Sequence, residues 1–117
     1  MATQPEVLGL STVAGGVELN LRIPADLDCL PDHFPRFPMV PGVVQLDWAI
    51  GFGRQHLGVS GEFRGIAGLK FQHPLLPRAA VTLALSASGD ELKFSYRTRE
   101  RTCSSGRVQF AAVRAGA

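Results

Sequence analysis

One stretch of this chain, between residues 32 and 48, gathers the residue types that acid–base chemistry needs. It reads DHFPRFPMVPGVVQLDW, with His33 near one end and the carboxylate of Asp47 near the other. The unperturbed pKa of a histidine, about 6.5, leaves its imidazole neutral and basic at neutral pH. Gly42 lies between them, and an unpartnered N–H group at the start of a helix can bind a developing negative charge. A base, a carboxyl group and an anion-binding amide are therefore available in one segment.

The proline spacing in this stretch predicts that the histidine lies on a stiff loop. Pro35, Pro38 and Pro41 fix φ at every third residue and move the preceding residues out of the α region. We therefore expect residues 33–41 to form an extended loop that leads directly into the next element.

That next element is predicted to be a helix from about Pro41 to His56, with Gly58 as its stop. The first ten residues after the proline are almost all apolar, and only Gln45 and Asp47 are polar among them. Such a pattern predicts a helix that is buried nearly all round. A carboxylate among apolar side chains has to be paired, hydrogen bonded or held protonated, so the spacing also predicts a functional role or an ion pair for Asp47.

The rest of the chain carries the alternating pattern of strands and the composition of turns. We expect strands near residues 6–10, 17–23, 63–71, 79–87, 91–97 and 108–112, with turns at 14–16, 88–90 and 104–106. One long central helix and five or six antiparallel strands predict an α+β domain in which the sheet wraps the helix. The chain of 117 residues is expected to be a single domain, residues 1–117.

Composition excludes several classes of function. Apolar residues are 45% of the chain and charged residues 19%, which fits a globular protein and not a disordered one. The net charge of +2 comes without the basic and aromatic constellation that nucleic-acid binding needs. No leader pattern and no apolar run of about 18 residues is present, so we expect a cytoplasmic protein with no membrane partner. Cys29 and Cys103 suggest neither a disulfide framework nor a metal site, and we interpret both as reduced packing residues.

Two motifs resemble one known family. HFPxxPxxPGxxxxD, with PGV opening the helix, resembles the active-site segment of the hotdog-fold 3-hydroxyacyl-acyl carrier protein dehydratases of bacterial fatty-acid synthesis. LKFQHPLLP, residues 69–77, resembles the KFxxPVxPGD strand and turn of that family. Two departures occur, because Arg78 and Ala79 replace the usual Gly-Asp and Asp32 replaces the usual glycine before the histidine. The run PGVVQLDWA is also similar to the dehydratases of aryl polyene pathways.

The resemblance implies a hotdog fold and a role for each of the three chemical groups. His33 would remove the proton next to the thioester carbonyl, and the N–H of Gly42 would bind the thioester oxygen. Asp47 would either protonate the departing hydroxyl or orient it, and the sequence does not distinguish between these two roles. The implied reaction converts 3-hydroxyacyl-acyl carrier protein to trans-2-enoyl-acyl carrier protein. It needs no metal and no cofactor beyond the 4′-phosphopantetheine that carries the substrate.

The same resemblance implies contacts and partners. The residues expected to contact the substrate are Phe34, Phe37, Pro41, Val43 and Phe71. Arg36 and Arg78 are expected to bind the acidic acyl carrier protein. In the family two hotdog protomers share each site, so we expect a homodimer or higher homo-oligomer, or a pair with a homologous hotdog subunit.

Other interpretations remain open for the whole chain and for single residues. The chain could be a hotdog acyl thioesterase, which needs no histidine base, or a non-catalytic hotdog subunit. Asp47 could form an ion pair with Arg54 on the same helix. Trp48 and Phe52 are interpreted as core residues, and His56 and His73 as surface or strand-end residues.

Overall fold

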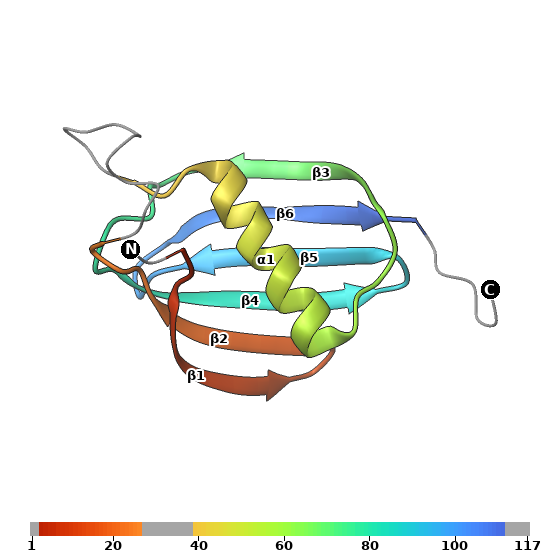
Figure 1. Ribbon diagram of the computed structural model, residues 1–117, viewed down its shortest axis with the longest axis horizontal. Coiled ribbons are helices and arrows are strands. Elements are labelled where there is room, and N and C mark those ends of the chain that lie inside the picture. Colours follow the sequence, from red (N-terminus) through yellow and green to blue (C-terminus); the bar gives the residue numbers. More distant parts are fainter. Residues whose placement is uncertain (1–2, 27–38, 112–117) are drawn as a thin grey trace.

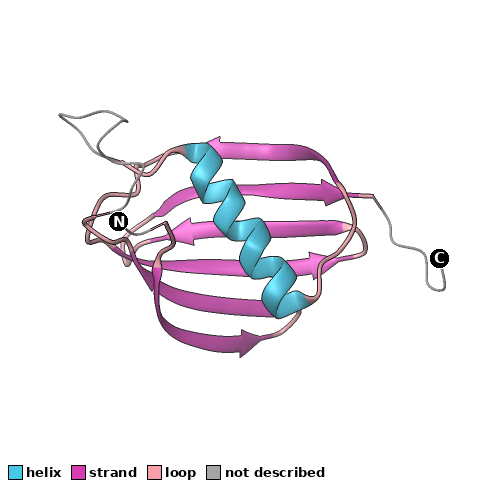
Figure 2. Cartoon of the chain, viewed as in Figure 1, coloured by secondary structure: helices cyan, strands magenta, loops and turns pink. Residues whose placement is uncertain are grey.

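In the described part of the chain, six antiparallel strands form one sheet, and a single helix crosses one face of it diagonally (Figure 1). The computed structural model describes residues 3–26 and 39–111. The elements are β1 (Glu6–Val13), β2 (Gly16–Arg22), α1 (Gly42–Leu57), β3 (Phe63–Phe71), β4 (Ala80–Ser88), β5 (Glu91–Arg97) and β6 (Thr102–Phe110). Their order in the sheet is β1-β2-β4-β5-β6-β3, so β1 and β3 are the edge strands (Figure 2). The expected α+β architecture with one long helix is confirmed.

The helix boundaries follow the proline and glycine signals within a residue. Pro41 stands at the N-cap with φ −59° and ψ 148°, and α1 begins at Gly42. Gly58 ends the helix in the left-handed region, with φ 66°, and its N–H donates to the carbonyl of Gly53. The helix has 16 residues. Within residues 3–26 and 39–111, no helix combines the length and the apolar character that crossing a membrane requires.

The core lies between α1 and the central strands. The helix packs mainly on β4 and also on β2 and β5, with Trp48, Ala49 and Phe52 buried against them. Trp48 and Phe52 are thus the core residues that the sequence predicted. A Cβ on Gly53 would come within 2.6 Å of a Leu92 methyl group, so the glycine allows the helix to approach β5 closely.

The helix is not buried nearly all round, and this expectation is wrong. Val43 is 73% exposed, and Asp47, Gly51 and Arg54 are also exposed. These positions recur every three or four residues and therefore share one side of the helix. The sheet covers only the opposite side, so an almost continuous apolar sequence still leaves one stripe of α1 in contact with solvent.

The turn expected at residues 104–106 is also absent. These residues lie inside β6, and the hairpin is made at Thr98–Arg101, where the N–H of Thr98 donates to the carbonyl of Arg101 at 2.9 Å. The small residues are there for packing, because a Cβ on Gly106 would lie 3.1 Å from the Phe94 ring and 3.2 Å from Leu69. Serine and glycine in a strand can mark close approach of neighbours as well as a turn.

Edge strand β3 extends the inner face of the sheet beyond the helix. Phe63 pairs with Phe110 and Ile66 with Val108, and both β6 partners are buried on the inner face. Directly paired residues of neighbouring strands point to the same face. The β3 side chains therefore also face inward, yet Phe63 is 51% and Ile66 36% exposed. Among residues 3–26 and 39–111, an apolar surface on the core side of the sheet therefore stays partly exposed.

Candidate active site

A pocket of about 330 Å³ opens between the start of α1 and the end of β3. Two proline-containing segments meet there, one leading into the helix and one following β3. The residues that line it are Met39, Val40, Pro41, Gly42, Gln45, Phe71, Gln72, His73 and Pro74. The pocket brings together the two sequence motifs, which are separated in the chain by the rest of α1 and most of β3.

Gly42 supplies the first amide of the helix to this pocket. The N–H groups of Val44 and Gln45 both donate to the carbonyl of Pro41, at 3.1 Å each. Among the described residues, the amides of Gly42 and Val43 have no such acceptor, which is the usual state of first-turn N–H groups. These amides and the positive end of the helix dipole favour a negative charge next to them.

The lack of a side chain at Gly42 serves packing as well. A Cβ there would lie 2.5 Å from Cζ of Phe71, so the aromatic ring from β3 occupies the space that a side chain would take. Phe71 is 51% exposed and lines the pocket together with Pro41. Val43, also expected to contact substrate, is exposed and does not line this pocket.

Asp47 lies on the exposed stripe of α1, and its predicted burial is wrong for this protomer. The alternative ion pair with Arg54 does not form either. Arg54 instead donates to the carbonyl of Gly61 at 3.0 Å, and its guanidinium lies 5.1 Å from the centre of the Phe110 ring. The carboxylate is therefore presented to the surroundings of the protomer and not to its core.

A buried polar cluster lies directly beneath the first turn of the helix, and the sequence prediction missed it. Gln45 is 3% exposed, and its side chain bonds to the carbonyl of Val40 at 3.1 Å and to the hydroxyl of Ser104 at 2.6 Å. The hydroxyl of Tyr96 donates to the backbone carbonyl of Gln45 at 2.6 Å. The available signal was a glutamine on the buried face of an apolar helix.

A second feature that sequence reasoning missed is the pairing of His73 with Arg101. Nη1 of Arg101 lies 3.3 Å from Nδ1 of His73. A guanidinium can only donate, so Nδ1 accepts and the ring proton is on Nε2. Both Gln72 and His73 donate their N–H groups to the carbonyl of Cys103, at 2.8 and 3.0 Å, which fixes this wall of the pocket to β6. The strand-end position expected for His73 is correct, but the residue also lines the pocket.

Several expected site residues lie outside the described part of the chain. These are His33, Phe34, Arg36 and Phe37, together with Cys29. Cys103 is a buried free thiol, as expected for a packing residue, and burial raises its pKa.

Arg78, the other residue expected to bind the carrier, is exposed and has φ 69°. Its N–H donates to the carbonyl of Ile23 at 2.7 Å. The left-handed conformation explains why a glycine is the usual residue here in the resembling family, since an L side chain is strained at this φ.

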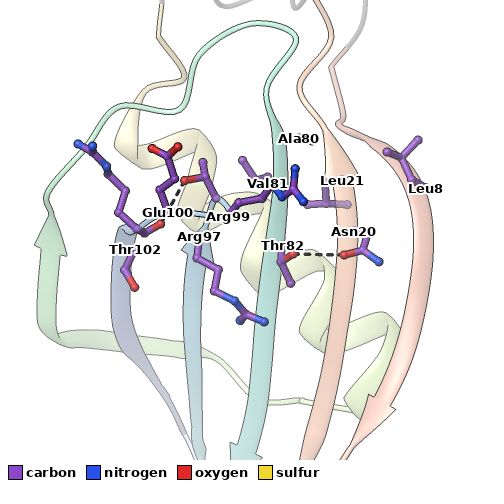
Figure 3. Close-up of a pocket in the computed structure, with 12 residues that line it drawn as sticks. Leu8, Asn20, Leu21, Ala80, Val81, Thr82, Arg97, Arg99, Glu100 and Thr102 are labelled. Carbon is purple, nitrogen blue, oxygen red and sulfur yellow. Dashed lines mark hydrogen bonds between the residues drawn. The ribbon is translucent and has the colours of Figure 1, made fainter.

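A larger pocket, about 500 Å³, lies on the outer face of the sheet, away from α1 (Figure 3). Arg97, Arg99 and Arg101 line one side of it. Part of its polar lining is already paired, since Thr82 donates to Asn20 at 3.2 Å within the pocket and Arg97 bonds at 2.9 Å to Glu18, which lies outside the lining. Neither a helix N-terminus nor a histidine contributes to its lining, so it is a weaker candidate for acid–base chemistry.

Comparisons with known proteins agree with the arrangement of helix and sheet. The model of the ApeI-like family, described as ApeI dehydratase, matches residues 11–107. The structure is similar to the dehydratase heterocomplex ApeI:P from Xenorhabdus doucetiae, with a TM-score of 0.83 and 28% identity over 91% of this chain and 96% of that one. An uncharacterized protein from Erwinia carotovora subsp. atroseptica gives a TM-score of 0.79 and 33% identity over 93% of this chain and 97% of the other. No curated protein sequence matches the chain. The expected hotdog fold is thereby confirmed.

Proposed function

Because the chain belongs to the ApeI-like dehydratase family, we propose that it dehydrates 3-hydroxyacyl-acyl carrier protein to trans-2-enoyl-acyl carrier protein. The pathway we propose is polyene or fatty-acid biosynthesis, and the acyl chain is carried on 4′-phosphopantetheine. The observation that supports the proposal best is the helix start at Gly42, which opens on an apolar-walled pocket built from both family-like motifs.

The proposed reaction has three parts, and one chemical group of the protein carries out each part. His33 accepts the proton from the carbon next to the thioester carbonyl, and the electron pair moves onto the thioester oxygen. The Gly42 amide donates a hydrogen bond to that oxygen while it carries negative charge. As the electron pair moves back from this oxygen to form the carbon–carbon double bond, the bond between carbon 3 of the acyl chain and its hydroxyl breaks. Asp47 supplies a proton to the departing hydroxyl or orients it, so that water and the enoyl thioester are the products.

Turnover by single variants tests these roles. His33→Ala and Asp47→Asn are each expected to lower kcat by at least about 10²-fold, the size of a lost general acid or base. Asp47→Glu should retain part of the activity, because relatives in the resembling family carry glutamate there. The measurement is enoyl absorbance after addition of a 3-hydroxyacyl thioester, with a melting curve to check folding. Wild-type turnover by a folded His33→Ala protein would overturn the assignment.

The same assay separates the thioesterase alternative. A thioesterase releases free thiol from a simple acyl thioester, whereas a dehydratase produces enoyl absorbance without releasing thiol. Release of thiol with no enoyl product would replace dehydration by hydrolysis as the function of this site.

We also propose that a second hotdog subunit completes the site. The reasons are the position of Asp47 on an exposed stripe of α1 and the apolar inner face at β3, which residues 3–26 and 39–111 leave partly exposed. The solved ApeI:P assembly is a heterocomplex, so the second subunit could be a homologue in place of a second copy. If two copies share the site, inactive His33→Ala and Asp47→Ala proteins should regain activity when unfolded and refolded together. Half of randomly assorted dimers are mixed and have one intact site, so recovery should approach roughly a quarter of wild-type sites.

The two kinds of partner give different results. If the partner is a homologue, the purified chain alone should be inactive, refolded mixtures should stay inactive, and adding the homologue should restore turnover. A chain that contributes structure only would tolerate His33→Ala even in the active heterocomplex. That last result would favour the non-catalytic interpretation.

Carrier binding is proposed for Arg36 and Arg78. Arg78→Glu should raise KM for carrier-bound substrate and leave KM for a short pantetheine substrate unchanged, because only the carrier brings the acidic surface. Lys93→Glu makes the same charge reversal at an exposed position on β5, away from the helix start, and serves as the control. Equal changes for both substrates, or for both variants, would count against this surface.

A further inference from the structure

We infer that Gln45 and Ser104, assisted by Tyr96, position the anion-binding amide of Gly42. This inference rests on the proposed function, but it concerns residues that the reaction scheme does not use. Gln45 and Ser104 are the buried polar side chains among the described residues, and they bond to each other across the core at 2.6 Å. They act as positioning residues, because their side-chain polar atoms bond to Val40 and to each other, although Gln45 also lines the pocket.

The direction of each hydrogen bond in the cluster is fixed by chemistry. The carbonyl of Val40 can only accept, so the side-chain amide of Gln45 must turn its nitrogen toward it, at 3.1 Å. The amide oxygen then faces Ser104, whose hydroxyl must donate. The orientation of one side chain therefore links the segment before the helix to strand β6.

Tyr96 holds the backbone of the same residue. Its hydroxyl donates to the carbonyl of Gln45 at 2.6 Å. Burial raises the pKa of Tyr96 well above its ordinary value of 10.0, and the charge of Asp47 raises this pKa further. The phenol therefore stays protonated at neutral pH and can donate this hydrogen bond. Tyr96 and Ser104 are cross-strand partners on β5 and β6, and together they hold one residue of α1 by its side chain and its backbone.

The segment that carries Gly42 is thus fixed from two sides. The N–H of Val40 donates to the carbonyl of Leu75 at 2.9 Å, and its carbonyl accepts from Gln45. Only Pro41 separates this residue from Gly42. Because an oxyanion donor works only when it is aimed before the charge appears, restraint of this segment translates directly into catalysis.

Stability alone is a poor reason for this cluster. Buried polar groups offer little net gain over well-packed apolar ones, and they cost free energy whenever a partner is lost. The neighbouring core positions on β4 and β5 are filled by leucine and phenylalanine. A polar cluster placed only beneath the helix start is better explained by a demand for exact orientation there.

The test uses Ser104→Ala, Gln45→Leu and the double variant in the full chain, assembled with its partner subunit if one is needed. Thr82→Val is the matched control, since Thr82 also donates its hydroxyl to a side-chain amide oxygen, that of Asn20 at 3.2 Å, but on the outer face. We expect each cluster variant to lower kcat by about 10- to 100-fold with little change in KM. The double variant should be no worse than Gln45→Leu, because the two residues act as one unit. Thr82→Val should keep wild-type kcat.

A second readout does not depend on activity. In ¹⁵N-glycine-labelled protein, the Gly42 amide resonance should shift in both cluster variants but not in Thr82→Val. Lower melting temperatures with unchanged kcat and an unchanged Gly42 resonance would overturn the inference and leave a structural role only. If the wild-type protein has no dehydratase activity, the proposed function fails, and the Gly42 resonance still decides whether the cluster orients this amide.

Discussion

Strands β4 and β3 are both nine residues long and both carry apolar side chains on the inner face of the sheet, yet these side chains have different surroundings. On β4, Val81, Leu83 and Leu85 are buried beneath α1. On β3, Phe63 and Phe71 are each half exposed although they face the same side of the sheet. The helix packs over the strand in the middle of the sheet, whereas at the edge strand its first residue, Gly42, contacts Phe71.

The comparison separates two meanings of an apolar strand. In β4 the pattern reports the core of the protomer. In β3 it reports an apolar surface that the described residues, 3–26 and 39–111, leave exposed, and exposed apolar patches usually mark interaction sites. Phe71 at the end of β3 also lines the pocket next to Gly42, so part of this exposed apolar surface adjoins the proposed site.

The largest contrast is expected when equivalent side chains are shortened in the two strands. Leu83→Ala should lower the free energy of unfolding by about 2–5 kcal/mol, because the side chain is fully buried and leaves a cavity. Ile66→Ala should lower it by less than about 1 kcal/mol in the separate chain. Urea unfolding of each purified variant measures both. Similar losses would show that β3 is as well covered in the protomer as β4.

The next prediction tests whether the exposed inner face of β3 binds a second hotdog subunit. Ile66→Asp places a charge on the uncovered inner face and should weaken binding to a second hotdog subunit by at least tenfold, since an unpaired charge at an interface is costly. Thr82→Asp, on the outer face of β4, is the control and should bind normally. Analytical ultracentrifugation with a second copy, or with a homologue, measures both. Equal affinities would place the interface elsewhere.

A smaller effect on stability is expected at high pH, and it tests whether the Tyr96 side chain on the inner face of the sheet is closed to solvent. Because the pKa of Tyr96 is raised in the folded state, its contribution to stability is complete below pH 10.0 and is lost as the pH rises through the higher folded-state value. Tyr96 is the only tyrosine in the chain, so phenolate absorbance follows it directly. Tyr96→Phe should cost about 1 kcal/mol at neutral pH and remove this part of the alkaline destabilisation. A midpoint near pH 10 in the folded protein would contradict burial.

The smallest effect is expected in the turn that connects the two regions. Arg78 has φ 69°, and replacing it with glycine relieves the side-chain strain at the expense of more freedom in the unfolded chain. Arg78→Gly should therefore raise the free energy of unfolding by roughly 0.5–1 kcal/mol. Arg64→Gly, on β3 with ordinary φ, should lower it and serves as the control. A loss of stability in both variants would mean that the arginine makes favourable contacts that outweigh the strain.

Local signals in the sequence determined the elements and the family. Pro41 and Gly58 bound the helix within a residue, because each acts through its own backbone angles. The hotdog expectation followed from the HFPxxPxxPGxxxxD spacing, which is a property of one short segment. The prediction of a turn at residues 104–106 was wrong because Gly106 packs against side chains from two other strands and Ser104 bonds to Gln45 of the helix, and a local pattern does not show such neighbours.

The tertiary structure decided which apolar side chains are buried and which polar side chains contact each other. The sequence of α1 suggested burial all round, but a single sheet face can cover only one side of a helix, and Asp47 lies on the other. Gln45 and Ser104 are 59 residues apart and meet because β6 passes beneath the helix start. The pocket next to Gly42 likewise exists because the end of β3 returns to that point. Contacts between distant segments depend on strand order and helix placement, and no local spacing in the chain encodes them.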